Sequence, residues 1–120
     1  NICLTCQPPN SPDCNVLDLG FFAAIQSLQQ REATATIDEL IAAVVKAFDD
    51  LPWQSLDNVF LSLQNVLECI MNYGGGNGFK LPHMGKEALR RQGILPESVE
   101  CEMESVEAAW DSLFDFEKEE

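Results

Sequence analysis

Positive charge is scarce in this sequence. Its 120 residues include 7 Lys and Arg against 20 Asp and Glu, and the formal net charge is -13 at pH 7. Affinity for nucleic acid depends on clustered Lys and Arg side chains that release counterions from the phosphate backbone. The composition therefore argues against DNA binding by this chain. The acidic residues are densest in the last quarter, residues 91–120, which contains ten acidic and two basic side chains.

Long hydrophobic runs and histidine are also lacking. No run of about 18 apolar residues is present, so the sequence offers no membrane-spanning helix and no membrane partner is expected. His83 is the single histidine, which leaves no basis for a Ser-His-Asp catalytic set. With 46% hydrophobic residues, however, the chain can bury a core. Its first residues read as the middle of a domain, so we expect a larger domain upstream.

The cysteines are odd in number, which indicates free thiols in a reducing compartment. They are Cys3, Cys6, Cys14, Cys69 and Cys101. The spacing of Cys3 and Cys6, with Cys14 as a third ligand, permits a zinc site. Residues three apart on a strand point to opposite faces, however, and the residues around Cys3 favour a strand. We therefore prefer a structural or incidental role to zinc binding.

The hydrophobic spacing predicts one short strand followed by four or five helices. Ile2–Cys6 reads as the strand, ended by two prolines. Asn15 is expected to cap a helix, in which Gly20 indicates a close packing contact. The apolar face of that helix contains Leu17, Phe21, Ile25 and Leu28.

The clearest helix follows the capping-box pair Thr36 and Glu39. Its apolar residues have the period of an amphipathic helix: Ile37, Leu40, Ile41, Val44, Val45 and Phe48. Further helices are predicted over about 54–73, 86–92 and 102–116. The glycine-rich segment 74–78 predicts a flexible loop.

Asp18 allows two interpretations. It lies three residues after Asn15, where an acidic side chain interacts favourably with the helix dipole and the free amides of the first turn. Spacing alone favours this role over that of a metal ligand. The spacing and periodicity of the residues therefore predict a helical domain but assign no reaction to it.

One block of sequence resembles a known family. Residues 7–22, QPPNSPDCNVLDLGFF, are similar to the signature around the third catalytic aspartate of plant-type mariner-like DNA transposases. The similarity continues at 24–29, at 36–41, and in two short later segments, LPHM at 81–84 and RQGILP at 91–96. It therefore extends over most of the chain, and the first block is its most specific part.

The resemblance implies an α/β fold. The chain would be the C-terminal fragment of a ribonuclease-H-like transposase or integrase domain, in which Ile2–Cys6 is a late strand of a mixed sheet. Residues 1–73 would form the end of the catalytic domain, with the strand, the turn and helix of Asp18, and two further helices. Residues 74–120 would form a Gly-rich loop and a helical tail.

The resemblance also implies roles at the turn. Asp18 corresponds to the third acid of the family, which is catalytic and binds a metal, whereas Pro12, Asp13 and Asn15 shape the loop. In that family two magnesium (or manganese) ions activate water or a DNA 3′-hydroxyl, so that transposon-end DNA is cut and joined. The implied location is the nucleus, and the complete enzyme would be a homodimer. No DNA-binding residues can be assigned.

Several features depart from the family. Cys14 stands in place of Leu and Ala23 in place of a basic residue, and the other two aspartates and the helix-turn-helix region are not among these 120 residues. We therefore expect this chain alone to be inactive, to bind no metal and to bind no DNA. The alternative hypothesis is a small acidic helical module that binds protein without catalysis.

The charge distribution gives the first testable prediction. The chain should show no measurable binding to duplex DNA at physiological salt, because it has no cluster of cations to displace counterions. An anisotropy titration of a labelled duplex measures this directly. Saturable binding in the micromolar range or tighter would contradict the prediction.

Overall fold

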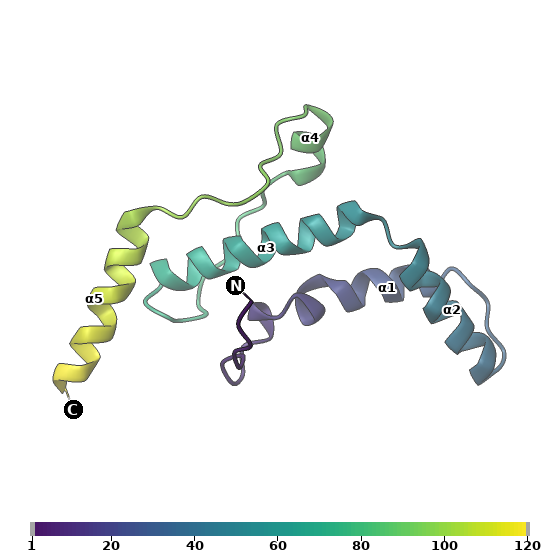
Figure 1. Ribbon diagram of the computed structural model, residues 1–120, viewed down its shortest axis with the longest axis horizontal. Helices are drawn as coiled ribbons and strands as arrows, with labels where there is room; N and C mark the ends of the chain where they lie inside the picture. Colours follow the sequence, from purple (N-terminus) through teal and green to yellow (C-terminus); the bar gives the residue numbers. More distant parts are fainter. Residues whose placement is uncertain (1, 120) are drawn as a thin grey trace. The chain divides into compact units, whose positions relative to one another are not determined.

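The computed structural model describes the backbone of residues 2–119 and the side chains of residues 2–115. The described residues are arranged as short and long helices joined by loops (Figure 1). In chain order these are the 3-10 helix η1 (Pro12–Cys14), the π-helix η2 (Leu17–Phe21), and the α-helices α1 (Phe22–Gln29), α2 (Ile37–Asp50), α3 (Trp53–Asn72), α4 (Lys86–Arg91) and α5 (Met103–Glu119). The chain forms two compact units, residues 1–63 and residues 64–120, with the boundary inside α3.

The predicted strand is absent, and the α/β fold expected from the resemblance is wrong for this chain. Residues 2–6 have no regular secondary structure, and Ile2 and Leu4 are fully exposed. Strand residues are stabilised by hydrogen bonds to a neighbouring strand. None of the residues described here forms one. Apolar residues in an extended segment therefore gain neither a ladder nor a buried face.

The five predicted helices are confirmed, and local interactions explain where α2 begins. The Thr36 hydroxyl oxygen accepts a hydrogen bond from the Glu39 N–H at 3.2 Å. The Glu39 carboxylate accepts from the Thr36 N–H at 3.3 Å and from the Ala35 N–H at 2.7 Å. These bonds satisfy backbone donors that a helix start leaves without partners. The predicted capping box is therefore confirmed.

Glycines end two of the helices. Gly74 follows α3 with a φ of 60°, and the next residue, Gly75, donates its N–H to the Ile70 carbonyl at 2.9 Å. This is the Schellman arrangement, which needs a left-handed residue just past the helix. α4 ends in the same way at Gly93, whose φ is 73°. The loop predicted at 74–78 is also confirmed.

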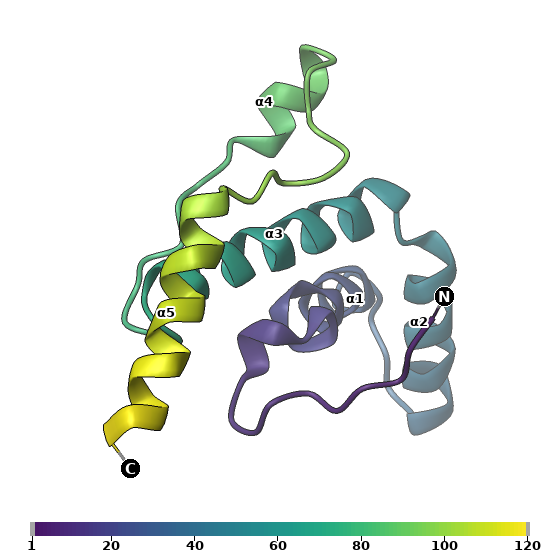
Figure 2. The same ribbon diagram turned by 60° about the vertical axis from the view of Figure 1, so that its left-hand side comes forward.

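Within residues 1–63, α2 lies against α1, as both ribbon views show (Figure 2). The side chains that α2 buries are the small ones, Ala43 at 6% and Ala47 at 3% exposure. Phe21, at the end of η2, meets Phe48 of α2 edge to face, with ring centroids 6.2 Å apart. The contact between the two helices therefore depends on small residues and one aromatic pair.

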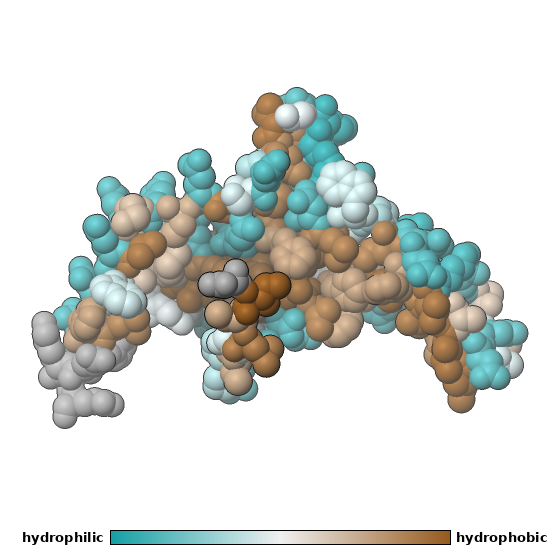
Figure 3. All heavy atoms as spheres, in the orientation of Figure 1, coloured by the Kyte–Doolittle hydropathy of each residue, from teal (hydrophilic) through white to brown (hydrophobic). Residues whose placement is uncertain are grey.

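Apart from the edge of Phe48 that meets Phe21, the large apolar side chains of α2 remain outside this contact. Its predicted amphipathic period is present, but its members are between 41% and 76% exposed. They are Ile37, Leu40, Ile41, Val44, Val45 and Phe48. Figure 3 shows hydrophobic surface in the region of α2, at the right of the view. We call this set of six side chains the α2 stripe.

Within residues 64–120, the second half of α3 anchors two loops. The Gln64 side-chain oxygen accepts from the Val99 N–H at 2.6 Å, and the Asn65 amide donates to the Pro82 carbonyl at 3.5 Å. Val66 is 2% exposed. The predicted stripe of α3 is thus only partly buried, since its Leu67 is exposed.

α5, like α2, buries a small side chain and leaves large apolar side chains exposed. Among its described side chains Ser105 is buried, whereas Met103, Trp110 and Leu113 on its predicted apolar face are exposed.

No helix in the described part of the chain combines the length and hydropathy that a membrane crossing requires.

A close approach fixes η2 against the first half of α3. A Cβ atom placed on Gly20 would lie 2.7 Å from Cγ2 of Val59, a distance that real Cβ atoms essentially never show. The close packing contact predicted at Gly20 is therefore confirmed. The glycine allows the η2 backbone to come nearer to α3 than any side chain would permit.

Gly20→Ala tests this contact. Overpacking against a β-branched side chain costs about 1–3 kcal/mol, which should exceed the gain of about 1 kcal/mol in helix propensity. We expect urea unfolding to show net destabilisation. In a Val59→Ala background the same substitution should become neutral or stabilising. Gly78→Ala is the control, because a Cβ there meets nothing within 4 Å. Equal effects of Gly20→Ala in both backgrounds would refute the contact.

Candidate functional site

The segment that carries Asp18 begins with a hydrogen-bonded turn. The Gln7 side-chain amide donates to the Ser11 carbonyl at 2.7 Å, and the Ser11 hydroxyl donates to the Pro8 carbonyl. Asn10 has a φ of 56°, a left-handed conformation that Asn tolerates better than most residues. These bonds reverse the chain direction immediately before η1.

Asn15 caps the helical segment that follows, as predicted. Its backbone is extended, with φ -121° and ψ 117°. Its side-chain oxygen accepts from the Leu17 N–H at 3.0 Å. Its backbone carbonyl accepts from the Leu19 N–H at 2.8 Å. This is the geometry of an N-cap, in which a side-chain oxygen replaces the missing partner of a first-turn amide.

The same Asn15 side chain orients Asp18. Its amide nitrogen donates to the Asp18 Oδ2 at 3.3 Å, while Asp18 itself is exposed. Two residues apart in a helical turn point to roughly opposite sides, so Asp18 lies on the side of η2 opposite Gly20. Because Gly20 is held against Val59, the Asp18 carboxylate points away from that contact.

The helix around Asp18 is wound more widely than an α-helix. The Phe22 N–H donates to the Leu17 carbonyl, five residues back. Such π-helical turns are rare and occur frequently at functional sites. The hydrophobic spacing around Asn15 indicated a helix but gave no sign of this winding, which depends on the fit of η2 against its neighbours.

The other residues assigned from the resemblance lie close by in the chain. Pro12 is the first residue of η1, and Asp13, which follows it, is exposed. The hydrogen bonds that define the loop come from Gln7 and Ser11 as well as Asn15. Sequence reasoning missed Gln7, although polar residues beside two prolines are a recognised turn signal.

The described residues contain no complete set of ligands for a metal ion. Among the described residues, no three or more His, Cys, Asp or Glu side chains are grouped so that they could hold a metal ion. Asp18 therefore belongs to no such group in the part of the chain that the structure describes. Cys3 and Cys6 are exposed and Cys14 is partly buried, all as free thiols, so the zinc hypothesis gains no support from these residues.

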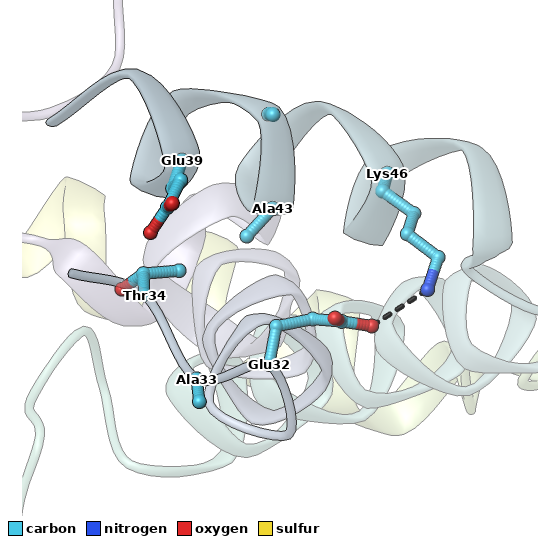
Figure 4. A pocket seen from close by; sticks show the side chains of 7 residues that line it. Glu32, Ala33, Thr34, Glu39, Ala43 and Lys46 are labelled. Carbon is cyan, nitrogen blue, oxygen red and sulfur yellow. Dashed lines mark hydrogen bonds and ion pairs between the residues drawn. The ribbon is translucent and has the colours of Figure 1, made fainter. Parts of the chain in front are cut away.

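A hollow of about 250 Å³ lies between α2 and the loop that precedes it (Figure 4). Its charged groups are engaged with each other or with the backbone. The Lys46 ammonium lies 2.6 Å from the Glu32 carboxylate, which raises the pKa of Lys46 above its ordinary value. Glu39 belongs to the capping box. The charged groups of the hollow therefore have a structural explanation.

Comparison of the chain with protein families, with curated proteins and with solved structures found no match in any of the three.

The Asn15 cap gives a testable prediction. Asn15→Ala removes the acceptor of the Leu17 N–H and the donor to Asp18, and should destabilise the chain by about 1 kcal/mol. Asn15→Ser keeps a hydrogen-bond acceptor at the cap, and its stability should be close to that of the parent chain. Thermal unfolding followed by circular dichroism compares them. If both variants melt alike, Asn15 does not act as the cap.

Proposed function

We propose that this chain is the part of a mariner-like DNA transposase that supplies the third catalytic aspartate, Asp18. The observation that carries the proposal is the similarity of residues 7–22 to the family signature. The geometry is compatible with it, since Asp18 is exposed at a helix start and held by Asn15. The proposal does not require a β-sheet within residues 1–120.

Asp18 would contribute one carboxylate to the metal site of the complete enzyme. Magnesium takes near-octahedral oxygen ligands and is bound in proteins through carboxylates and substrate phosphates. The described residues do not fit such a site by themselves, because Asp18 belongs to no group of three or more metal-ligating side chains among them. The role of this chain is therefore to fix the direction of one carboxylate through the Asn15 hydrogen bond and the Gly20 contact.

Partners and location follow as parts of the same proposal. The substrate of the complete enzyme would be transposon-end DNA in the nucleus. With a net charge of -13, these residues would add repulsion rather than attraction toward DNA. The cationic contacts to DNA would therefore come from other residues of the enzyme.

A second candidate function is an acidic helical module that binds protein without catalysis. The exposed α2 stripe favours it, because contiguous exposed apolar surface commonly marks an interaction site. The two candidates use different residues, since this one depends on α2 and the first depends on Asp18.

The proposal is tested by joining residues 1–120 to the upstream catalytic residues of a plant-type mariner-like transposase. Strand cleavage at transposon ends with magnesium is measured for the joined chain and its variants. Asp18→Ala should reduce cleavage by about a thousandfold or more, because metal catalysis contributes several kcal/mol. Binding of the terminal repeats should be unchanged. Asp13→Ala is the matched control, and should lower activity only moderately through the loop.

Two results would overturn the assignment. Cleavage by Asp18→Ala at nearly the parent rate would leave only the helix-start role for this carboxylate. An equal loss of cleavage and of DNA binding in Asp18→Ala would indicate a structural defect rather than a missing ligand.

A further inference from the structure

The α2 stripe has the repeat of a helix-pairing seam. Ile37, Ile41, Val44 and Phe48 are spaced by four, three and four residues, which is the alternation of a and d positions in a heptad. Leu40 and Val45 widen the apolar surface on either side. At 1.5 Å per residue the 14 residues of α2 extend over about 21 Å. This surface can accommodate about four turns of another helix.

The contact with α1 leaves this seam open. α2 buries Ala43 and Ala47 against its neighbour. At about 100° per residue, Ile41 lies on the side of α2 opposite Ala43. Ile41 is 57% exposed. Apart from Phe48, which meets Phe21 edge to face, the stripe is therefore a face of the helix that the packing of residues 1–63 leaves exposed.

The charges beside the stripe are negative. Asp38 and Asp49 are eleven residues apart, so they lie on one line along α2, next to Val45. Both are exposed. The one cation of α2, Lys46, lies on the far side, where it pairs with Glu32 at 2.6 Å (Figure 4). The border of the stripe thus carries carboxylates with no cation of α2 beside them.

We propose that the α2 stripe binds an amphipathic helix of a partner protein whose apolar face is bordered by Lys and Arg. The seam spacing favours a helix, because heptad positions interlock with the same spacing on a facing helix. The acidic border favours a basic partner. A second copy of this chain would bring the same Asp38 and Asp49 and a further net charge of -13, which opposes association. An anionic membrane surface is disfavoured for the same reason.

The proposal is tested with the full chain and labelled synthetic helices. The probe has Leu at a and d positions and Lys at e and g positions over three heptads. One comparison peptide has Glu in place of Lys, and a second has the Leu and Lys residues in scrambled order. Fluorescence anisotropy should show binding of the ordered Leu/Lys peptide and weaker binding of both others.

Variants of the chain locate the binding surface. Ile41→Glu places a charge in the seam and should weaken binding of the Leu/Lys peptide by about tenfold to a hundredfold. Ala42→Glu adds the same charge off the seam at an exposed neighbouring position, and should not weaken it. Circular dichroism checks that each variant keeps its helix content.

A charge-reversed variant tests the border without touching the stripe. Asp38→Lys combined with Asp49→Lys should shift the preference of the chain from the Leu/Lys to the Leu/Glu peptide. This double variant tests whether the acidic border selects a basic helix even if Ile41→Glu fails to fold.

Three results would overturn the proposal. One is equal binding of the scrambled peptide, which would show only unspecific charge attraction. Another is an unchanged preference after the charge reversal. The third is a dimer of the chain in sedimentation that Ile41→Glu dissociates, which would show that a second copy occupies the stripe. None of these results involves Asp18, so each leaves the proposed function as it stands.

Discussion

Close backbone approach through small side chains determines how this protein packs. Gly20 lets η2 lie against Val59, and Ala43 and Ala47 are the residues that α2 buries. Small residues bring helices together but remove little apolar area from water, and the hydrophobic gain scales with that area. The large side chains of α2 consequently stay exposed. The stability of residues 1–63 therefore rests on steric fit, helix caps, one aromatic pair and the buried Leu61 of α3, which is 1% exposed.

The candidate site depends on the same constraint. Asp18 can face outward because Gly20, on the opposite side of η2, fixes which side of that helix faces α3. Asn15 then holds the carboxylate from the cap position. A side chain at position 20 would push η2 away from α3 and turn Asp18 with it. The orientation of the Asp18 carboxylate thus depends on a residue that has no side chain of its own.

Sequence patterns predicted what is decided locally. The Thr36 and Glu39 box and the Asn15 cap each depend on residues within a few positions of one another, so their spacing is visible in the sequence. The strand at Ile2–Cys6 was predicted wrongly, because a strand depends on a distant partner. Periodicity likewise showed which face of α2 is apolar but could not show whether anything covers it. The pairing of Lys46 with Glu32, across a loop, leaves no periodic signal.

The two candidate surfaces share an electrostatic property although they lie on different helices. A lone exposed carboxylate at Asp18 and an apolar stripe bordered by Asp38 and Asp49 each gain from a positively charged counterpart. In a chain with a net charge of -13, such a counterpart also relieves repulsion among the remaining carboxylates. Both interactions should therefore weaken as salt screens the charges, but only the one at α2 retains an apolar contribution that salt does not remove. The salt dependence of binding thus separates a charge-driven contact at Asp18 from a mixed contact at α2.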